Sequence, residues 1–147
     1  MMHRFILLAL ALLAPALASE DLKTAAAEPN PVKRARLGLA NGERTALKAG
    51  EACKGAEYEK CNELLTEVQE SVELASKSLD QSGIDARRSP RHFKDAEMRS
   101  HKILRLVEPI RAYVHPDDLE HFDAVARRIS QINGEFLSAV LGKKKKK

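Results

Sequence analysis

The sequence has few aromatic residues and few cysteines. Its 147 residues include no tryptophan, two tyrosines, four phenylalanines and two cysteines, so a core must come mainly from aliphatic side chains. It also lacks the H-E-x-x-H, G-x-S-x-G, phosphate-loop and dinucleotide-binding motifs. The two cysteines form neither a C-x-x-C-H haem motif nor a common zinc spacing. We therefore expect a non-enzymatic protein without a cofactor.

The first residues have the pattern of a signal peptide. Met1–Arg4 is basic, Phe5–Ala18 is uncharged, and the apolar run ends in Ala16–Ala18, a small-x-small pattern at which signal peptidase cleaves. This run is shorter than the roughly 20 apolar residues of a transmembrane helix, so an uncleaved anchor is the less favoured alternative. We predict a signal peptide over 1–18 and an exported mature protein, periplasmic or extracellular, that is soluble after cleavage.

Positive charge is concentrated at the end of the chain. The sequence has 25 basic and 21 acidic residues, which gives a net charge of +4. Without Arg4 and the terminal lysines, 19 basic residues remain against 21 acidic ones, so the rest of the chain is almost neutral. We predict a disordered basic tail over 143–147, which comprises Lys143, Lys144, Lys145, Lys146 and Lys147.

Four segments have apolar residues at alternating spacings of three and four, which is typical of one face of a helix. After a flexible leader over 19–30, Asn30 and Pro31 predict the start of a helix over 31–54. The other three are expected at 57–81, 89–114 and 116–141, and Gly83 and Gly142 mark two of their ends. The resulting helical domain covers 31–142.

Helices of similar length with short connections favour an all-α antiparallel four-helix bundle. Two stacked helical hairpins, as in a short α-solenoid, are the alternative. The helix expected at 57–81 is acidic and the one expected at 89–114 is basic. Because opposite charges attract, we expect these two helices to lie side by side.

Cys53 and Cys61 are expected to form a disulfide. On one continuous helix they would lie about 12 Å apart, beyond the ~7 Å that a disulfide tolerates. A turn near Gly55 would bring them together, and export permits the bond. Two buried free cysteines, or an intermolecular pair, are the alternatives.

The segment GAEYEKC at 55–61 resembles the turn and second-helix start of a tetratricopeptide unit, and the likeness extends over about 46–75. One extra residue separates Gly55 from Tyr58, and no repeat of roughly 34 residues follows. The layout as a whole is similar to small secreted bacterial helical proteins without an assigned function. That resemblance implies no active site.

Two groups of residues are candidates for binding. His115, Asp117 and His121 are candidates for a metal site, because one imidazole and nearby carboxylates suit a divalent ion. The alternative is a solvated helix start. The second group is basic and precedes or begins a helix: Arg87, Arg88, Arg91 and Lys94. With the lysine tail it predicts binding to an anionic lipid or polysaccharide, and export argues against nucleic acid. Alternatively, these residues pair with the acidic helix and the tail only aids solubility.

We therefore expect an exported, non-enzymatic helical binding or interaction module, as a monomer or a homodimer, whose partner is an unknown protein or envelope component. A protein that associates with an anionic envelope surface, and a helical bundle that binds a metal or cofactor, are the alternatives.

Overall fold

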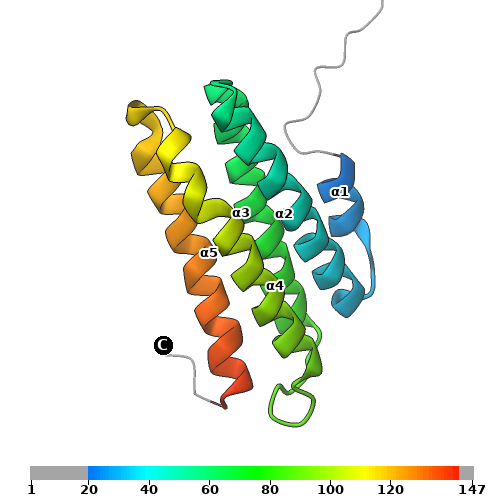
Figure 1. Cartoon of the computed structure of the whole chain (residues 1–147). Helices are drawn as coiled ribbons and strands as arrows, with labels where there is room; N and C mark the ends of the chain where they lie inside the picture. Colours follow the sequence, from blue (N-terminus) through cyan, green and yellow to red (C-terminus); the bar gives the residue numbers. More distant parts are fainter. Residues whose placement is uncertain (1–19, 143–147) are drawn as a thin grey trace, which may run out of the picture.

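The computed structural model describes residues 20–142, and this part of the chain is all-α, as predicted. Five α-helices and two 3₁₀-helices, with no strand, make up these residues (Figure 1): α1 Glu20–Ala27, α2 Pro31–Lys54, α3 Tyr58–Gln81, α4 Arg91–Val107, η1 Glu108–Tyr113, η2 Pro116–Asp118 and α5 Leu119–Val140. None of these helices is long and apolar enough to cross a bilayer. The predicted signal peptide over 1–18 and the tail Lys143–Lys147 lie outside the described residues.

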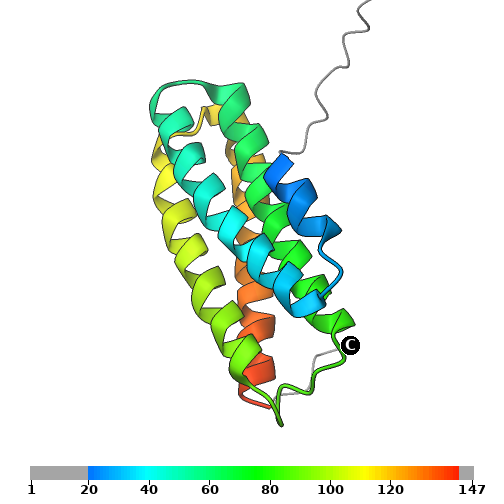
Figure 2. The same ribbon diagram turned by 90° about the vertical axis from the view of Figure 1, so that its right-hand side faces the viewer.

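The prediction of a flexible leader is wrong for residues 20–27, which form α1. Leu22 and Ala25 are three residues apart, so they share one face of this helix, and both are buried. The helix packs against α2 (Figure 2), and Arg34 of α2 donates a hydrogen bond of 2.9 Å from Nη1 to the carbonyl oxygen of Glu28 in the connection. A helix this short is marginal alone, so its packing on α2 stabilises it.

Helix α2 begins and continues as predicted. The Oδ1 atom of Asn30 accepts a hydrogen bond of 3.0 Å from the backbone N–H of Lys33, and Pro31 is the first helical residue. The helix is continuous through Gly42, where an added Cβ would lie 2.9 Å from Cδ1 of Ile103 on α4. This glycine therefore allows close packing rather than a break.

The turn between α2 and α3 contains the predicted disulfide. Cys53 and Cys61 are bonded and buried, with their Cα atoms 5.1 Å apart. The left-handed backbone conformation of this turn is at Ala56, with a φ of 56°, and not at Gly55. The disulfide therefore joins the last turn of α2 to the first turn of α3.

The third predicted helix is α-helical only from Arg91 to Val107, and it continues as the 3₁₀-helix η1. Pro109 explains the change, because proline has no N–H to donate and its ring crowds the carbonyl one turn earlier. The buried stripe nevertheless continues through Ile110 and Val114. The fourth helix likewise begins with the short 3₁₀-helix η2 before α5.

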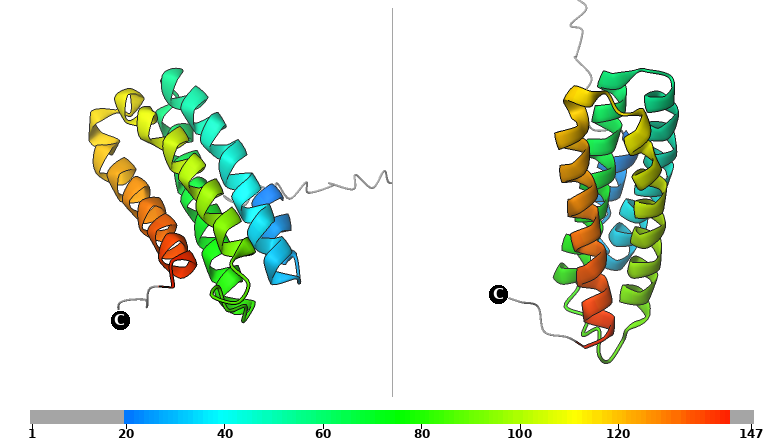
Figure 3. Two further views of the ribbon diagram at one scale, coloured as in Figure 1. Left: turned by 60° about the horizontal axis from the view of Figure 1, so that its bottom comes forward. Right: turned by 60° about the vertical axis from the view of Figure 1, so that its left-hand side comes forward.

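The long helices form two antiparallel hairpins, α2 with α3 and α4 with α5. The hairpins pack with α2 beside α4 and α3 beside α5, and the views in Figures 1 and 3 agree with this order. Gly42 lies near Ile103 and Gly50 lies near Ile110. Helix α2 therefore runs in the same direction as α4 and its continuation η1. The expectation that the acidic α3 and the basic α4 are close neighbours is wrong, since α4 packs more extensively on α2 and α5.

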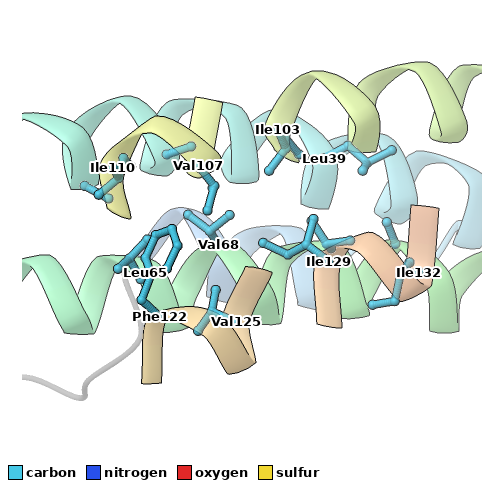
Figure 4. Close-up of a cluster of buried hydrophobic side chains, with 14 of the residues drawn as sticks. Leu39, Leu65, Val68, Ile103, Val107, Ile110, Phe122, Val125, Ile129 and Ile132 are labelled. Atoms are coloured by element: carbon cyan, nitrogen blue, oxygen red, sulfur yellow. The ribbon is translucent and has the colours of Figure 1, made fainter. Parts of the chain in front are cut away.

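The core lies where the four long helices meet (Figure 4), and its side chains are mainly aliphatic. Each long helix contributes side chains that are almost fully buried: Leu39, Leu65, Val68, Ile103, Val107, Phe122, Val125, Ile129 and Ile132. Burying each of these side chains contributes about 1.5–3 kcal/mol. The core therefore fixes the relative positions of α2 and α4, the two helices that form the candidate site.

Candidate anion-binding groove

Helix α4 begins with an unusual distribution of charge. Pro90 precedes it, none of the described side chains caps its first turn, and this turn contains no acidic residue. It contains the basic residues Arg91 and Lys94 instead. The N-terminal end of a helix carries a partial positive charge, so cations here are unfavourable and anions are favourable. An anion at this position would be stabilised by both the helix end and the two side chains.

An open groove of about 650 Å³ lies beside this first turn, between α4 and α2. It is lined by Arg36, Pro90, Arg91, His92, Lys94, Asp95, Met98 and Arg99. Four of these residues are Arg or Lys and one is Asp. The lining therefore has an excess of positive charge.

Among residues 20–142, one of the groove's four cations forms an ion pair. Arg99 donates from Nε to Oε1 of Glu43 at 3.3 Å, and Lys102 pairs with the other oxygen of Glu43, also at 3.3 Å. In the described part of the chain, Arg36, Arg91 and Lys94 are exposed and have no ion pair. These three side chains therefore remain available to an anion.

The structure separates the four predicted basic residues into two pairs. Arg91 and Lys94 line the groove, whereas Arg87 and Arg88 lie in the loop before α4. Arg87 donates from Nη2 to the carbonyl oxygen of Gly142 at 3.1 Å. Nε of Arg88 lies 3.9 Å from Oδ2 of Asp85 in the same loop. Lys143 to Lys147 follow Gly142 in the sequence and lie outside the described residues.

The alternative prediction was that the basic residues pair with the acidic helix, now α3. The four predicted basic residues form no ion pair with a described residue of α3. Arg99 and Lys102, further along α4, pair with Glu43 of α2. On α3, Glu73 pairs with Arg128 of α5, with 3.0 Å between Oε1 and Nε. These ion pairs therefore join helices that run in the same direction, α2 with α4 and α3 with α5.

Only two of the three candidate metal residues are close together among the described residues: Nδ1 of His115 lies 3.6 Å from Oδ2 of Asp117. The Nδ1 atom of His115 accepts a hydrogen bond of 3.1 Å from the backbone N–H of Asp117, and its ring packs edge-on against Tyr58. His121 instead contacts α3, where its Nε2 atom lies 3.1 Å from Oγ1 of Thr66. Over residues 20–142, no three His, Cys, Asp or Glu side chains are grouped as metal ligands.

A buried polar cluster between α2 and α3 was missed by the sequence analysis. Thr45 donates from Oγ1 to Oε2 of Glu67 at 2.8 Å, and Asn41 donates from Nδ2 to the same oxygen at 3.3 Å. Asn41 also donates to Oγ of Ser71 at 3.0 Å. Asn41 and Thr45 are one helical turn apart, as are Glu67 and Ser71, and this spacing was the available signal. The cluster is closed to solvent, so it links the two helices and offers no open site.

Arg36 and Arg99 were also missed as groove residues. Neither lies on an apolar stripe, and nothing in the sequence indicates that residue 36 of one helix faces residue 99 of another. In comparisons with protein-family models, curated proteins and solved structures, nothing matched this chain. The groove itself is therefore the basis for a functional proposal.

Proposed function

We propose that the protein is an exported, non-enzymatic helical module that binds an anionic component of the cell envelope through the groove between α2 and α4. One observation carries this proposal: a groove at the start of α4 is lined by three exposed cations, Arg36, Arg91 and Lys94, that form no ion pair with a described residue. Phosphate and carboxylate groups complement both the side chains and the helix end. Each cation held near an anionic surface contributes about 1 kcal/mol.

Two features support export. The sequence begins with a signal-peptide pattern, and Cys53 and Cys61 are bonded in the structure. Structural disulfides persist in oxidising compartments and are rare in the cytosol. An envelope surface is therefore the anionic partner that the protein would meet after export.

The lysine tail is a second region of the chain that would interact with the anionic surface. Arg87 holds Gly142 at the end of the molecule where the loop before α4 lies, and five lysines follow Gly142 in the sequence. We propose that this tail adds long-range attraction, whereas the groove makes the specific contact. Attraction by exposed lysines is weakened by salt.

Co-sedimentation with vesicles of phosphatidylglycerol and phosphatidylcholine tests the proposal. Binding should require phosphatidylglycerol, and the double variant Arg91→Glu/Lys94→Glu should bind at least tenfold more weakly. The matched control is Lys48→Glu/Lys77→Glu, which changes the charge equally at exposed residues outside the groove. Equal weakening in both variants would show that net charge alone acts, and it would contradict a groove.

A further inference from the structure

A second hollow, of about 530 Å³, lies at the other end of the same pair of helices, between α2 and η1. Its lining is largely apolar and includes Leu47, Gly50, Leu106, Ile110 and Tyr113. Leu47 is 58% exposed and Tyr113 is 48% exposed, which is unusual for large apolar side chains that border one hollow. Its volume is within the range of about 300–1,000 Å³ that is typical of small-molecule sites.

Gly50 keeps the floor of this hollow open. At Gly38 and Gly42, an added Cβ would come within 2.9 Å of an atom on a neighbouring helix, so packing requires glycine there. At Gly50 the nearest atoms belong to Ile110, at 3.8 Å, which is an ordinary contact. Glycine is unfavourable inside a helix, yet the packing of the protein leaves room for a side chain here. The space above Gly50 therefore belongs to the hollow and not to the core.

The charged groups of this hollow are mainly cationic. Lys54, in the last turn of α2, lies with Nζ 5.4 Å from the centre of the Tyr113 ring. Arg105 of α4 and Glu51 of α2 are the other charged groups of the lining, and all three side chains are exposed. Lys and Arg can lay their aliphatic stems along apolar surface while the charged ends remain in water. The hollow thus combines an apolar floor with a net positive rim.

We propose that this hollow binds a fatty acid, with the acyl chain over Gly50 and the carboxylate at Lys54. The apolar lining matches the chain, and the two cations outweigh the one carboxylate of Glu51. This site shares no residue with the anion-binding groove, so neither proposal depends on the other.

Calorimetric titration of the disulfide-bonded protein with saturated fatty acids from octanoate to palmitate, each below its micelle concentration, tests the proposal. Burial of one CH₂ group contributes about 0.8 kcal/mol, so each added CH₂ should tighten binding about fourfold until the hollow is full. Binding that does not change with chain length, or no binding of any member, would overturn the proposal.

Two sets of variants locate the ligand. Gly50→Leu should fill the hollow and weaken palmitate binding at least tenfold, whereas Gly134→Leu should not change it, because nothing lies within 4 Å of a Cβ at Gly134. Circular dichroism confirms that both variants fold. Lys54→Gln, at an exposed residue, should weaken binding of the carboxylate about fivefold but not of hexadecanol. Unchanged palmitate binding in Gly50→Leu, or equal losses for acid and alcohol, would contradict the assignment.

Discussion

Gly38 of α2 lies directly against the backbone of α3, because an added Cβ would be 2.9 Å from the carbonyl oxygen of Ser71. The side chain of Ser71 is engaged as well: its Oγ donates to the carbonyl oxygen of Glu67 at 2.8 Å and accepts from Asn41. Contacts with the backbone and the side chain of Ser71 thus set the distance between α2 and α3.

Gly38→Ala should destabilise the protein by about 1–3 kcal/mol, because overpacking forces the two backbones apart. This loss should appear although alanine is about 1 kcal/mol more favourable than glycine inside a helix. Urea unfolding measures the difference, and Gly134→Ala is the matched control. The control should be up to about 1 kcal/mol more stable than the original protein. Similar stabilisation by both substitutions would contradict the close contact.

Thr45→Val should cost about 1–3 kcal/mol, because it removes the hydroxyl that donates to the buried carboxyl group of Glu67. Valine keeps the shape of threonine, so lost packing contributes little. Thr45→Ser keeps the hydroxyl and should be less destabilising. The free energy of unfolding in urea distinguishes the two, and a larger loss in the serine variant would mean that the methyl group matters more than the hydrogen bond.

Replacing both Cys53 and Cys61 with serine should lower the free energy of unfolding by about 2–3 kcal/mol, as expected for the loss of a short cross-linked loop. The variant should keep its helix content, since most of the buried core side chains come from other parts of the four long helices. Thermal unfolding followed by circular dichroism tests both points. A midpoint that reductant does not change in the original protein would contradict a stabilising disulfide.

The acid dependence of stability should change when Asp123 is replaced. Arg111 donates to both carboxylate oxygens of Asp123, at 3.0 and 3.2 Å, and this hydrogen bonding lowers the pKa of Asp123 below its ordinary value. The ionised form therefore stabilises the folded state above the ordinary carboxyl pKa, and this contribution disappears as the pH falls through the lowered value.

Asp123→Asn should accordingly be slightly less stable than the original protein at neutral pH. The difference should vanish in strong acid, where Asp123 is protonated in both the folded and unfolded states. Melting temperatures measured as a function of pH test this. A difference that stays constant down to strong acid would show that ionisation of Asp123 is not responsible.

The helix positions were largely predictable because their signals are local. The Asn30 cap with Pro31, the positive φ of 69° at Gly83 and the repeating apolar stripe all act within a few residues. Helix α1 was missed because a segment of eight residues becomes stable only when Leu22 and Ala25 pack against a partner. The likeness to a tetratricopeptide unit at 46–75 stays a prediction.

The pairing of helices and the groove were not predictable in the same way. An apolar stripe shows which face is buried but not which helix covers it, and the net charges of α3 and α4 suggested the wrong neighbours. The deciding contacts join distant residues, such as Glu43 with Arg99 and Glu73 with Arg128. Arg91 and Lys94 were identified as candidates because they are close together in the sequence. Arg36 is far from them in the sequence and lies beside them only in the folded structure.

The most direct test of an anion-binding groove is an NMR titration of ¹⁵N-labelled protein with a short-chain phosphatidylglycerol below its micelle concentration. Our account predicts that the largest shifts will occur at the backbone amides of Arg91, His92 and Phe93, in the uncapped first turn of α4, and at Arg36. The shifts should saturate, and short-chain phosphatidylcholine should not reproduce them. Shifts confined to residues outside the groove, or spread evenly over all exposed lysines and arginines, would contradict it.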